Sequence, residues 1–506
     1  MNLVLIFFCF SLSALFACKG KSPGEKIFIG HDQRSLKTGA ISKSKIPPGN
    51  IGYILYDLDR KSVVTSHNRN KALIPSSTTK ILTTTAALNT LGADYRFKTL
   101  LCYTGRIKSG VLKGDLYLKG SGDPLFRVTN LMNMAEALKK SGIKKVLGNF
   151  YYDESALYSS NKIDDIMNAD ASYNPGLSAL SLDFNVIYAR WKPLEKKKIE
   201  KKMKNKIKEI FLIPSLPINR VAVSNVEFEE KRKFKFSNFK GREKWHLSAR
   251  IAKKAKEGKK RLPVKNPALY TATVFAKLCR LKGASLPPPK PKKVPRDHDI
   301  LFTNNGMPLI RLAELTLLYS NNLMAELILL GTAKKISGKV MDLEKSARIL
   351  EDFFSEKIKN VNWKGLYLNN GSGLTSDNRI SPEQLLAVLL YANSFKYDGR
   401  SYLSLLPISG WRGSLFRRLN KPDTAFRVWA KTGSINYAVS LAGYLFTKSN
   451  KKMLFVIIIN DMDKRKYFDK HPNIRFNKRT RRAIHWWTKK NKDAIDDILS
   501  EWIKKI

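Results

Sequence analysis

Ser77 and Lys80 stand three residues apart in the stretch IPSSTTKILTTTAAL, which covers residues 74–88. On a helix this spacing puts the two side chains on one face, so the lysine could take the proton from the hydroxyl and create a nucleophile. The spacing alone has little weight, because the chain contains 92 Lys and Arg residues and five other Ser–Lys pairs share it. The setting of Ser77 must therefore distinguish it.

The residues after Ser77 predict a helix. Apolar residues recur at helical spacing from Ile81 to Leu91, and Gly92 follows as a typical C-cap. Ser77 would lie in the first turn, where backbone N–H groups are free and the helix dipole favours negative charge. None of the other five pairs begins a comparably apolar helix, so we expect Ser77 to be the nucleophile and Lys80 its base.

Two further motifs follow in the chain. Ser320 and Asn322 form an S-x-N motif between two helical patterns, and the stretch VWAKTGSINY predicts a strand that carries a K-T-G motif. The residues of the latter are Lys431, Thr432, Gly433 and Ser434. Each motif recurs elsewhere, for example at Ser172 and at Lys37, so their order and setting select these copies.

The order S-x-x-K, S-x-N, K-T-G resembles the signature of penicillin-binding proteins and class A β-lactamases. Longer blocks extend the resemblance, among them LKGSGDP, NPGLSALSLDFNVI, NNGSGLTSDNRISPEQL and LPISGWRGSL. In order, these blocks resemble the D-Ala-D-Ala carboxypeptidase/endopeptidase family, the class C low-mass penicillin-binding proteins, from about residue 45 to residue 487. The chain departs from that family at Asn370 and Arg412, where the family usually has Asp. We expect Asn370 to remove a loop hydrogen bond and Arg412 to add charge near the cleft.

The resemblance implies a serine DD-peptidase. It would cleave D-Ala-D-Ala ends, D-Ala–meso-diaminopimelate cross-links of peptidoglycan, or both, through an acyl-enzyme on Ser77, with β-lactams as covalent inhibitors and without a cofactor. Ser320 would relay the proton to the leaving amine, and Asn322 would hold Lys80 and the substrate amide. Lys431, Thr432 and Ser434 would bind the terminal carboxylate. The N–H groups of Ser77 and Ser434 would bind the oxyanion.

The same resemblance implies an α+β fold, with an antiparallel sheet flanked by helices and a large, mostly β insertion. We expect a catalytic domain at 19–95 and 300–490, an insertion at 96–299 and an amphipathic C-terminal helix at 491–506. That helix would be docked on the domain or lie on a membrane surface. The segment LPPPKPKK before residue 294 predicts a stiff linker at a domain boundary.

The first 18 residues, MNLVLIFFCFSLSALFAC, are typical of a signal peptide. Leu15 is wrong for ordinary cleavage after Ala17, whereas LFAC resembles a bacterial lipobox in which Cys18 is lipidated. We therefore expect a periplasmic or envelope location, with a lipid anchor, a simple cleaved signal or an uncleaved anchor as alternatives. In an exported chain, Cys102 and Cys279 could form a disulfide or remain buried thiols.

A net charge of +50 is compatible with a protein that binds nucleic acid. The lysines are spread over the chain and the leader indicates export, so we expect most of the excess charge to lie on solvated surface. An anionic envelope polymer or lipid headgroup is the next alternative, and nucleic acid is the last. The chain has no C-x-x-C or H-E-x-x-H motif, which argues against a zinc site. Two rival functions remain: a β-lactamase or esterase on the same scaffold, and a peptidoglycan-binding protein without catalysis. The sequence does not indicate an oligomeric state.

Overall fold

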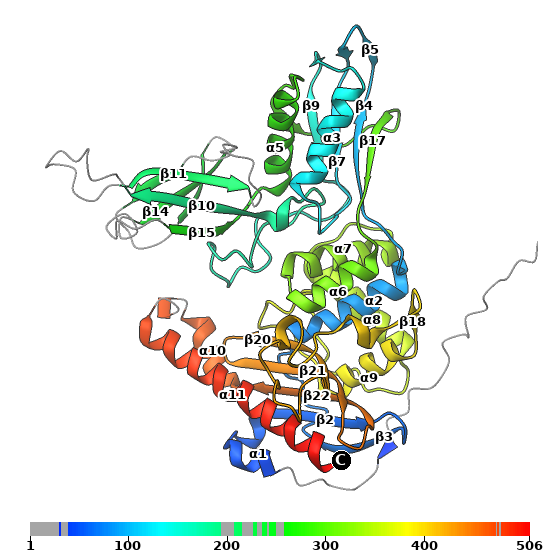
Figure 1. Cartoon of the computed structure of the whole chain (residues 1–506), viewed down its shortest axis with the longest axis vertical. Coiled ribbons are helices and arrows are strands. Elements are labelled where there is room, and N and C mark those ends of the chain that lie inside the picture. The colour runs from blue at the N-terminus through cyan, green and yellow to red at the C-terminus, as the bar shows by residue number, and fades with distance from the viewer. Residues whose placement is uncertain are drawn as a thin grey trace, which may run out of the picture.

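The computed structural model describes residues 30–31, 39–193, 207–214, 226–229, 235–239, 242–248, 258–471, 473–474 and 477–506. The predicted signal peptide and Cys18 lie outside these residues. Figure 1 shows a lower body built from the two ends of the chain and an upper body built from its middle.

The lower body contains a sheet that joins the two ends of the chain. In the described residues its strand order is β1-β3-β2-β22-β21-β20. The strands are β1 (Gly30–His31), β2 (Ile51–Asp57), β3 (Ser62–His67), β20 (Val428–Ile435), β21 (Ala438–Phe446) and β22 (Lys452–Asn460). β2, β22, β21 and β20 pair antiparallel, and β20 lies at the edge. The predicted strand for the K-T-G motif is confirmed.

Helices cover both faces of this sheet, so its central strands are buried throughout (Figure 1). Ile54 and Tyr56 of β2 share one core with α2 and α9, whereas Tyr53 and Leu55 share another with α11. The helices of the lower body are α1 (Gly39–Ser44), α2 (Thr79–Leu91), α6 (Leu309–Tyr319), α7 (Asn322–Ser337), α8 (Leu343–Lys357), α9 (Pro382–Asn393), α10 (Met462–Lys470) and α11 (Lys478–Lys505).

The C-terminal helix is longer than expected, because α11 begins at Lys478 and the segment 491–506 is its second half. Its apolar stripe is docked on the sheet rather than free for a membrane surface: Ile495, Ile498, Leu499, Trp502 and Ile503 are all fully buried. Within the described residues, no helix combines the length and the apolar character that crossing a bilayer requires.

The upper body contains a sheet with the order β16-β9-β7-β4-β17, against which α3 (Val128–Lys140) and α5 (Pro267–Leu281) pack (Figure 1). The strands are β4 (Lys98–Tyr103), β7 (Leu116–Lys119), β9 (Phe150–Asp153), β16 (Pro289–Pro291) and β17 (Asp299–Asn305). β17 pairs antiparallel with β4. The sheet therefore continues past residue 300, to Asn305.

Further strands complete the fold of the described residues. They are β5 (Arg106–Lys108), β6 (Val111–Lys113), β8 (Lys145–Val146), β10 (Val186–Pro193), β11 (Ile207–Pro214), β12 (Val226–Glu229), β13 (Lys235–Phe239), β14 (Arg242–Ser248), β15 (Gly258–Pro263), β18 (Lys396–Tyr397) and β19 (Arg400–Ser401). Cys102 and Cys279 are free thiols buried within the fold, so the predicted alternative of a disulfide is wrong.

The prediction of a linker at LPPPKPKK is also wrong. Pro289–Pro291 forms β16, which pairs parallel with β9 at the edge of the upper sheet. Proline has no N–H group to donate to a ladder, which confines it to edge strands, and this segment occupies such a position. The run of prolines therefore contributes an edge strand to the upper sheet.

Candidate active site

Ser77 lies in a 3-10 turn, η2 (Ser76–Thr78), that leads directly into α2. The turn is held by two hydroxyls, since Thr78 Oγ1 donates to the Pro75 carbonyl at 2.7 Å and Thr79 Oγ1 to the Ser76 carbonyl at 2.8 Å. Ser76 has a φ of 50° and is fully buried, whereas Ser77 is partly open to solvent. Of the two adjacent serines, only Ser77 is therefore accessible to a ligand.

Lys80 lies one turn further along and is fully buried. Its Nζ donates to Ser77 Oγ at 3.1 Å, to Asn322 Oδ1 at 2.9 Å and to the Ser372 carbonyl at 2.6 Å. Burial lowers the pKa of Lys80 to about 7, although Glu326 opposes the shift. An amine with this pKa is partly neutral near neutral pH and can accept the serine proton.

Glu326 is an acidic residue of this cluster that none of the three motifs includes. It is fully buried on α7, and its carboxylate accepts from the N–H groups of Gly371 at 2.9 Å and Ser372 at 3.0 Å. Burial raises the pKa of Glu326. Glu326 thus fixes the loop whose Ser372 carbonyl holds Lys80. An acidic residue four positions after Asn322, within the apolar stretch LMAELILL, was the available signal.

Ser320 and Asn322 lie at the junction of α6 and α7. Ser320 ends α6 in the left-handed conformation with a φ of 54°, and Asn321 caps α7 by accepting from the Met324 N–H at 3.0 Å. This sharp turn places the two motif residues in one site. Asn322 Oδ1 accepts from Lys80, and its Nδ2 donates to the Tyr173 carbonyl at 3.1 Å.

Lys431 is fully buried on β20, and its Nζ donates to Ser320 Oγ at 2.9 Å and to the Thr432 carbonyl at 2.6 Å. Burial, and then the neighbouring Lys80, lower the pKa of Lys431 well below its usual value. Gly433 allows β20 to approach the Ser77 turn, because a Cβ there would lie 2.7 Å from the Pro75 carbonyl oxygen. The three predicted motifs therefore meet in one site.

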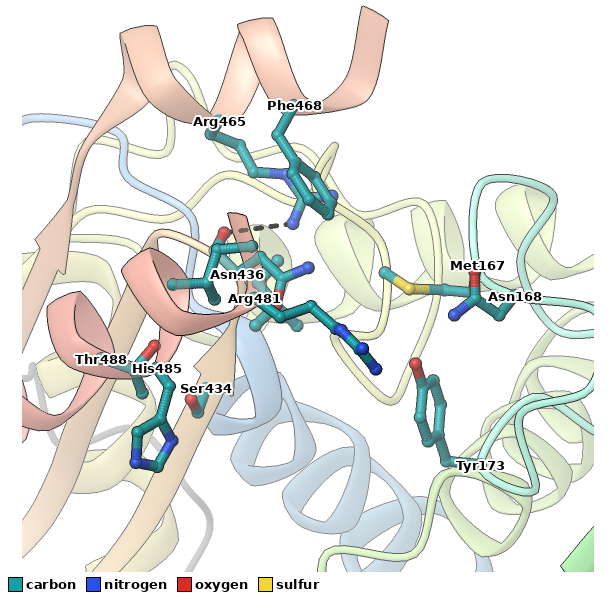
Figure 2. A pocket seen from close by; sticks show the side chains of 12 residues that line it. Met167, Asn168, Tyr173, Ser434, Asn436, Arg465, Phe468, Arg481, His485 and Thr488 are labelled. Atoms are coloured by element: carbon teal, nitrogen blue, oxygen red, sulfur yellow. Dashed lines mark hydrogen bonds between the residues drawn. The ribbon is translucent and has the colours of Figure 1, made fainter. Parts of the chain in front are cut away.

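A cavity of about 410 Å³ borders Ser434 at the end of β20. Figure 2 shows Arg481 reaching from α11 toward Tyr173, and His485 beside Ser434. Arg465 also lines the cavity, but Asp469 neutralises it through two hydrogen bonds of 2.7 and 2.8 Å. Arg481 therefore provides a positive charge in this cavity, next to β20, the strand that carries the K-T-G motif.

Asn370 and Arg412, the two departures from the family pattern, have different surroundings in the structure. Asn370 Oδ1 still accepts from the Gly373 N–H at 2.9 Å, while its buried Nδ2 has no partner among the described residues. Arg412 pairs with Glu314 at 3.1 Å, and the same carboxylate also pairs with Arg311 and Arg400. One carboxylate does not offset three guanidinium groups, so the expectation that Arg412 adds charge near the cleft stays a prediction.

Comparison with known proteins identifies related chains. A model of the D-Ala-D-Ala carboxypeptidase 3 (S13) family matches residues 35–477. The D-alanyl-D-alanine carboxypeptidase DacB of Haemophilus influenzae is 24% identical over 430 residues, which cover 82% of this chain and 86% of DacB. The penicillin-sensitive carboxypeptidase A of Dictyostelium discoideum is 24% identical over 431 residues, or 78% of this chain and 79% of that protein.

A similar fold occurs in a solved structure. Penicillin binding protein 4 (dacB) of Haemophilus influenzae superposes with a TM-score of 0.72 at 23% identity, covering 84% of this chain and 93% of that one. A second structure of that protein, with a TM-score of 0.68, is a complex with a β-lactam. The likeness confirms the predicted α+β fold with a sheet flanked by helices.

Proposed function

Because the chain belongs to the D-Ala-D-Ala carboxypeptidase 3 (S13) family and is thus a serine-type peptidase, we propose that it cleaves peptidoglycan stem peptides with Ser77 as the nucleophile. The observation that carries this proposal is the hydrogen bond of 3.1 Å between Lys80 Nζ and Ser77 Oγ. It joins an accessible hydroxyl to a buried amine whose pKa is lowered to about 7.

The reaction begins when neutral Lys80 takes the Ser77 proton. Ser77 Oγ attacks the carbonyl of the penultimate D-alanine, and the N–H groups of Ser77 and Ser434 bind the oxyanion. The proton passes from Lys80 to the leaving amine, with Ser320 as relay. Ser320 Oγ is held in the site by Lys431 Nζ, which donates to it at 2.9 Å. Water then hydrolyses the ester on Ser77 and releases the shortened peptide.

The substrate would be oriented by its charges. The terminal carboxylate would lie against Lys431, Thr432 and Ser434, where a cation and two hydroxyls meet. Asn322 would bind the substrate amide while it holds Lys80 at 2.9 Å. The cavity beside Ser434 would take part of the stem peptide, and Arg481 suits a carboxylate such as that of diaminopimelate.

The experiment that tests this function is a digestion of purified peptidoglycan fragments. We expect the wild-type chain to release free D-alanine from pentapeptides, to split cross-linked dimers into monomers, or both, as measured by mass spectrometry. Ser77→Ala should release neither product. A wild-type chain that leaves both fragments unchanged, yet retains its fold by circular dichroism, would overturn the proposal.

β-Lactams are proposed as covalent inhibitors, because their strained amide would meet the same nucleophile and the same carboxylate-binding groups. The name of the Dictyostelium relative and the β-lactam complex of the Haemophilus protein support this extension. We propose an envelope or periplasmic location, in agreement with a peptidoglycan substrate and with the predicted leader.

Cys18 provides a separate test of the proposed lipid anchor. Cys18→Ala should release the protein from the membrane fraction or leave its leader uncleaved, because the lipid would be attached to this thiol. Cell fractionation and the mass of the mature protein measure the effect. Unchanged fractionation together with an unchanged mass would mean that Cys18 carries no lipid.

A further inference from the structure

Two consecutive residues of the K-T-G motif contact serines from separate segments. Lys431 Nζ donates to Ser320 Oγ at 2.9 Å, and Thr432 Oγ1 donates to Ser414 Oγ at 2.9 Å. Ser320 ends α6, whereas Ser414 lies in the short helix η6 (Gly413–Leu415). Ser414 is exposed, and because it accepts from Thr432, its own proton remains for another acceptor.

A buried carboxylate holds the loop before Ser414 in place. Glu314 of α6 is 4% exposed, and its Oε1 accepts from Arg412 Nη1 at 3.1 Å. Arg412 Nη2 also donates to the Ser404 carbonyl at 2.6 Å, which joins the loop to a second segment. The same carboxylate also pairs with Arg311 and, at 3.2 Å, with Arg400. Loss of Arg412 would remove one of these three cationic partners and would release the loop from α6.

The loop is also packed closely on the end of α6. Gly413 has a φ of 67°, and a Cβ there would lie 3.1 Å from both the carbonyl oxygen and the Cδ2 of Leu318. Leu318 stands two residues before Ser320, so the loop and the S-x-N turn are held against each other. Their relative position sets the spacing between Ser414 and Ser320, and hence the place of Ser414 beside Thr432.

From these contacts we infer that Ser414 provides a further hydroxyl to the site that binds the terminal carboxylate of the substrate. We also infer that the Glu314–Arg412 ion pair holds Ser414 in position. This inference rests on the proposed function and deepens it, because it concerns recognition of a substrate with a free C-terminal carboxylate. Glu314 and Arg412 act through Ser414 and do not contact the substrate.

The test compares two peptides that differ only in their last group. One ends in D-Ala-D-Ala with a free carboxylate, and the other carries the C-terminal amide. Ser414→Ala and Arg412→Met should each raise the KM for the free peptide about tenfold, the factor that one hydrogen bond to a charged group contributes. The kcat for that peptide and the kcat/KM for the amide should change little.

Arg311→Met is the matched control, since Arg311 also pairs with Glu314 but lies on α6 rather than on the loop. It should leave the preference for the free carboxylate unchanged, and Arg412→Lys should restore part of it. Adding Arg412→Met to Ser414→Ala should cause no further rise in KM, because both changes remove the same contact. Melting temperatures identify variants that lose their fold.

The possible outcomes distinguish a failure of this inference from a failure of the proposed function on which it rests. If the wild-type chain cleaves neither peptide, both are overturned. If the wild-type chain cleaves the free peptide but the variants lose activity on both peptides equally, only the inference is overturned. A variant pair with additive effects on KM would also contradict it.

Discussion

Ser77→Ala is expected to abolish covalent labelling by penicillin and to lower peptidase turnover by about 10⁶-fold, the loss seen when a serine peptidase loses its nucleophile. Ser77 is partly open to solvent and lies 3.1 Å from the amine of Lys80. Ser76, its neighbour, is fully buried with its hydroxyl toward the Ala438 carbonyl. Ser76→Ala should therefore keep the label.

The label can be mapped directly. Incubation with penicillin, digestion and sequencing of the modified peptide should place the adduct on Ser77 in the fragment that contains PSSTTK. An adduct on Ser76, or on the serine of any other Ser–Lys pair at this spacing, would remove the central assignment. The unmodified mass of Ser77→Ala after the same incubation serves as the control.

The sequence predicted the three motifs and their elements because these depend on local patterns. Residues 81–91 have the period of a helix, and Lys431 lies in the stretch VWAKTGSI, which forms the edge strand β20. The S-x-N motif lies between two apolar helices, as expected, although the left-handed φ of Ser320 that turns one helix into the next was not predicted. Local periodicity thus located the residues that meet in the site.

The remaining residues of the site could not be predicted in the same way, because they depend on contacts between distant segments. The carboxylate of Glu326 accepts hydrogen bonds from the N–H groups of Gly371 and Ser372, which lie in a distant loop. The hydroxyl of Ser414 in η6 accepts a hydrogen bond from Thr432 in β20. Arg412 shows the difficulty most clearly. Its charge is visible in the sequence, but only the fold shows that it shares the Glu314 carboxylate with Arg311 and Arg400.

The prolines of β16 show a second reason why part of the fold could not be predicted from the sequence. A run of prolines is compatible both with an extended linker and with an edge strand, because the backbone conformations are similar. Only the neighbouring strand β9 distinguishes them, and it lies more than a hundred residues earlier. The choice between the two therefore required the tertiary pairing.

The second large effect is expected at Lys80. Lys80→Arg should lower the rate of acylation by penicillin by about 10²- to 10⁴-fold, the range of general-base catalysis, because a guanidinium does not lose its proton in this pH range. In the wild-type chain the acylation rate should fall as the pH drops below about 7, since Lys80 has a pKa of about 7 and protonation removes the base. Stopped-flow acylation across this pH range measures both effects.

Lys431→Arg is the matched comparison, because it changes the other buried lysine of the same cluster. Burial and Lys80 lower the pKa of Lys431, and an arriving carboxylate would raise it again. An arginine keeps a cation for that carboxylate, so part of the acylation should survive with weaker binding. If both lysines only held the site together, the two variants would lose acylation rate and melting temperature alike. A near-normal rate for Lys80→Arg would show that Lys80 is not the base, because no neutral amine would then stand beside Ser77.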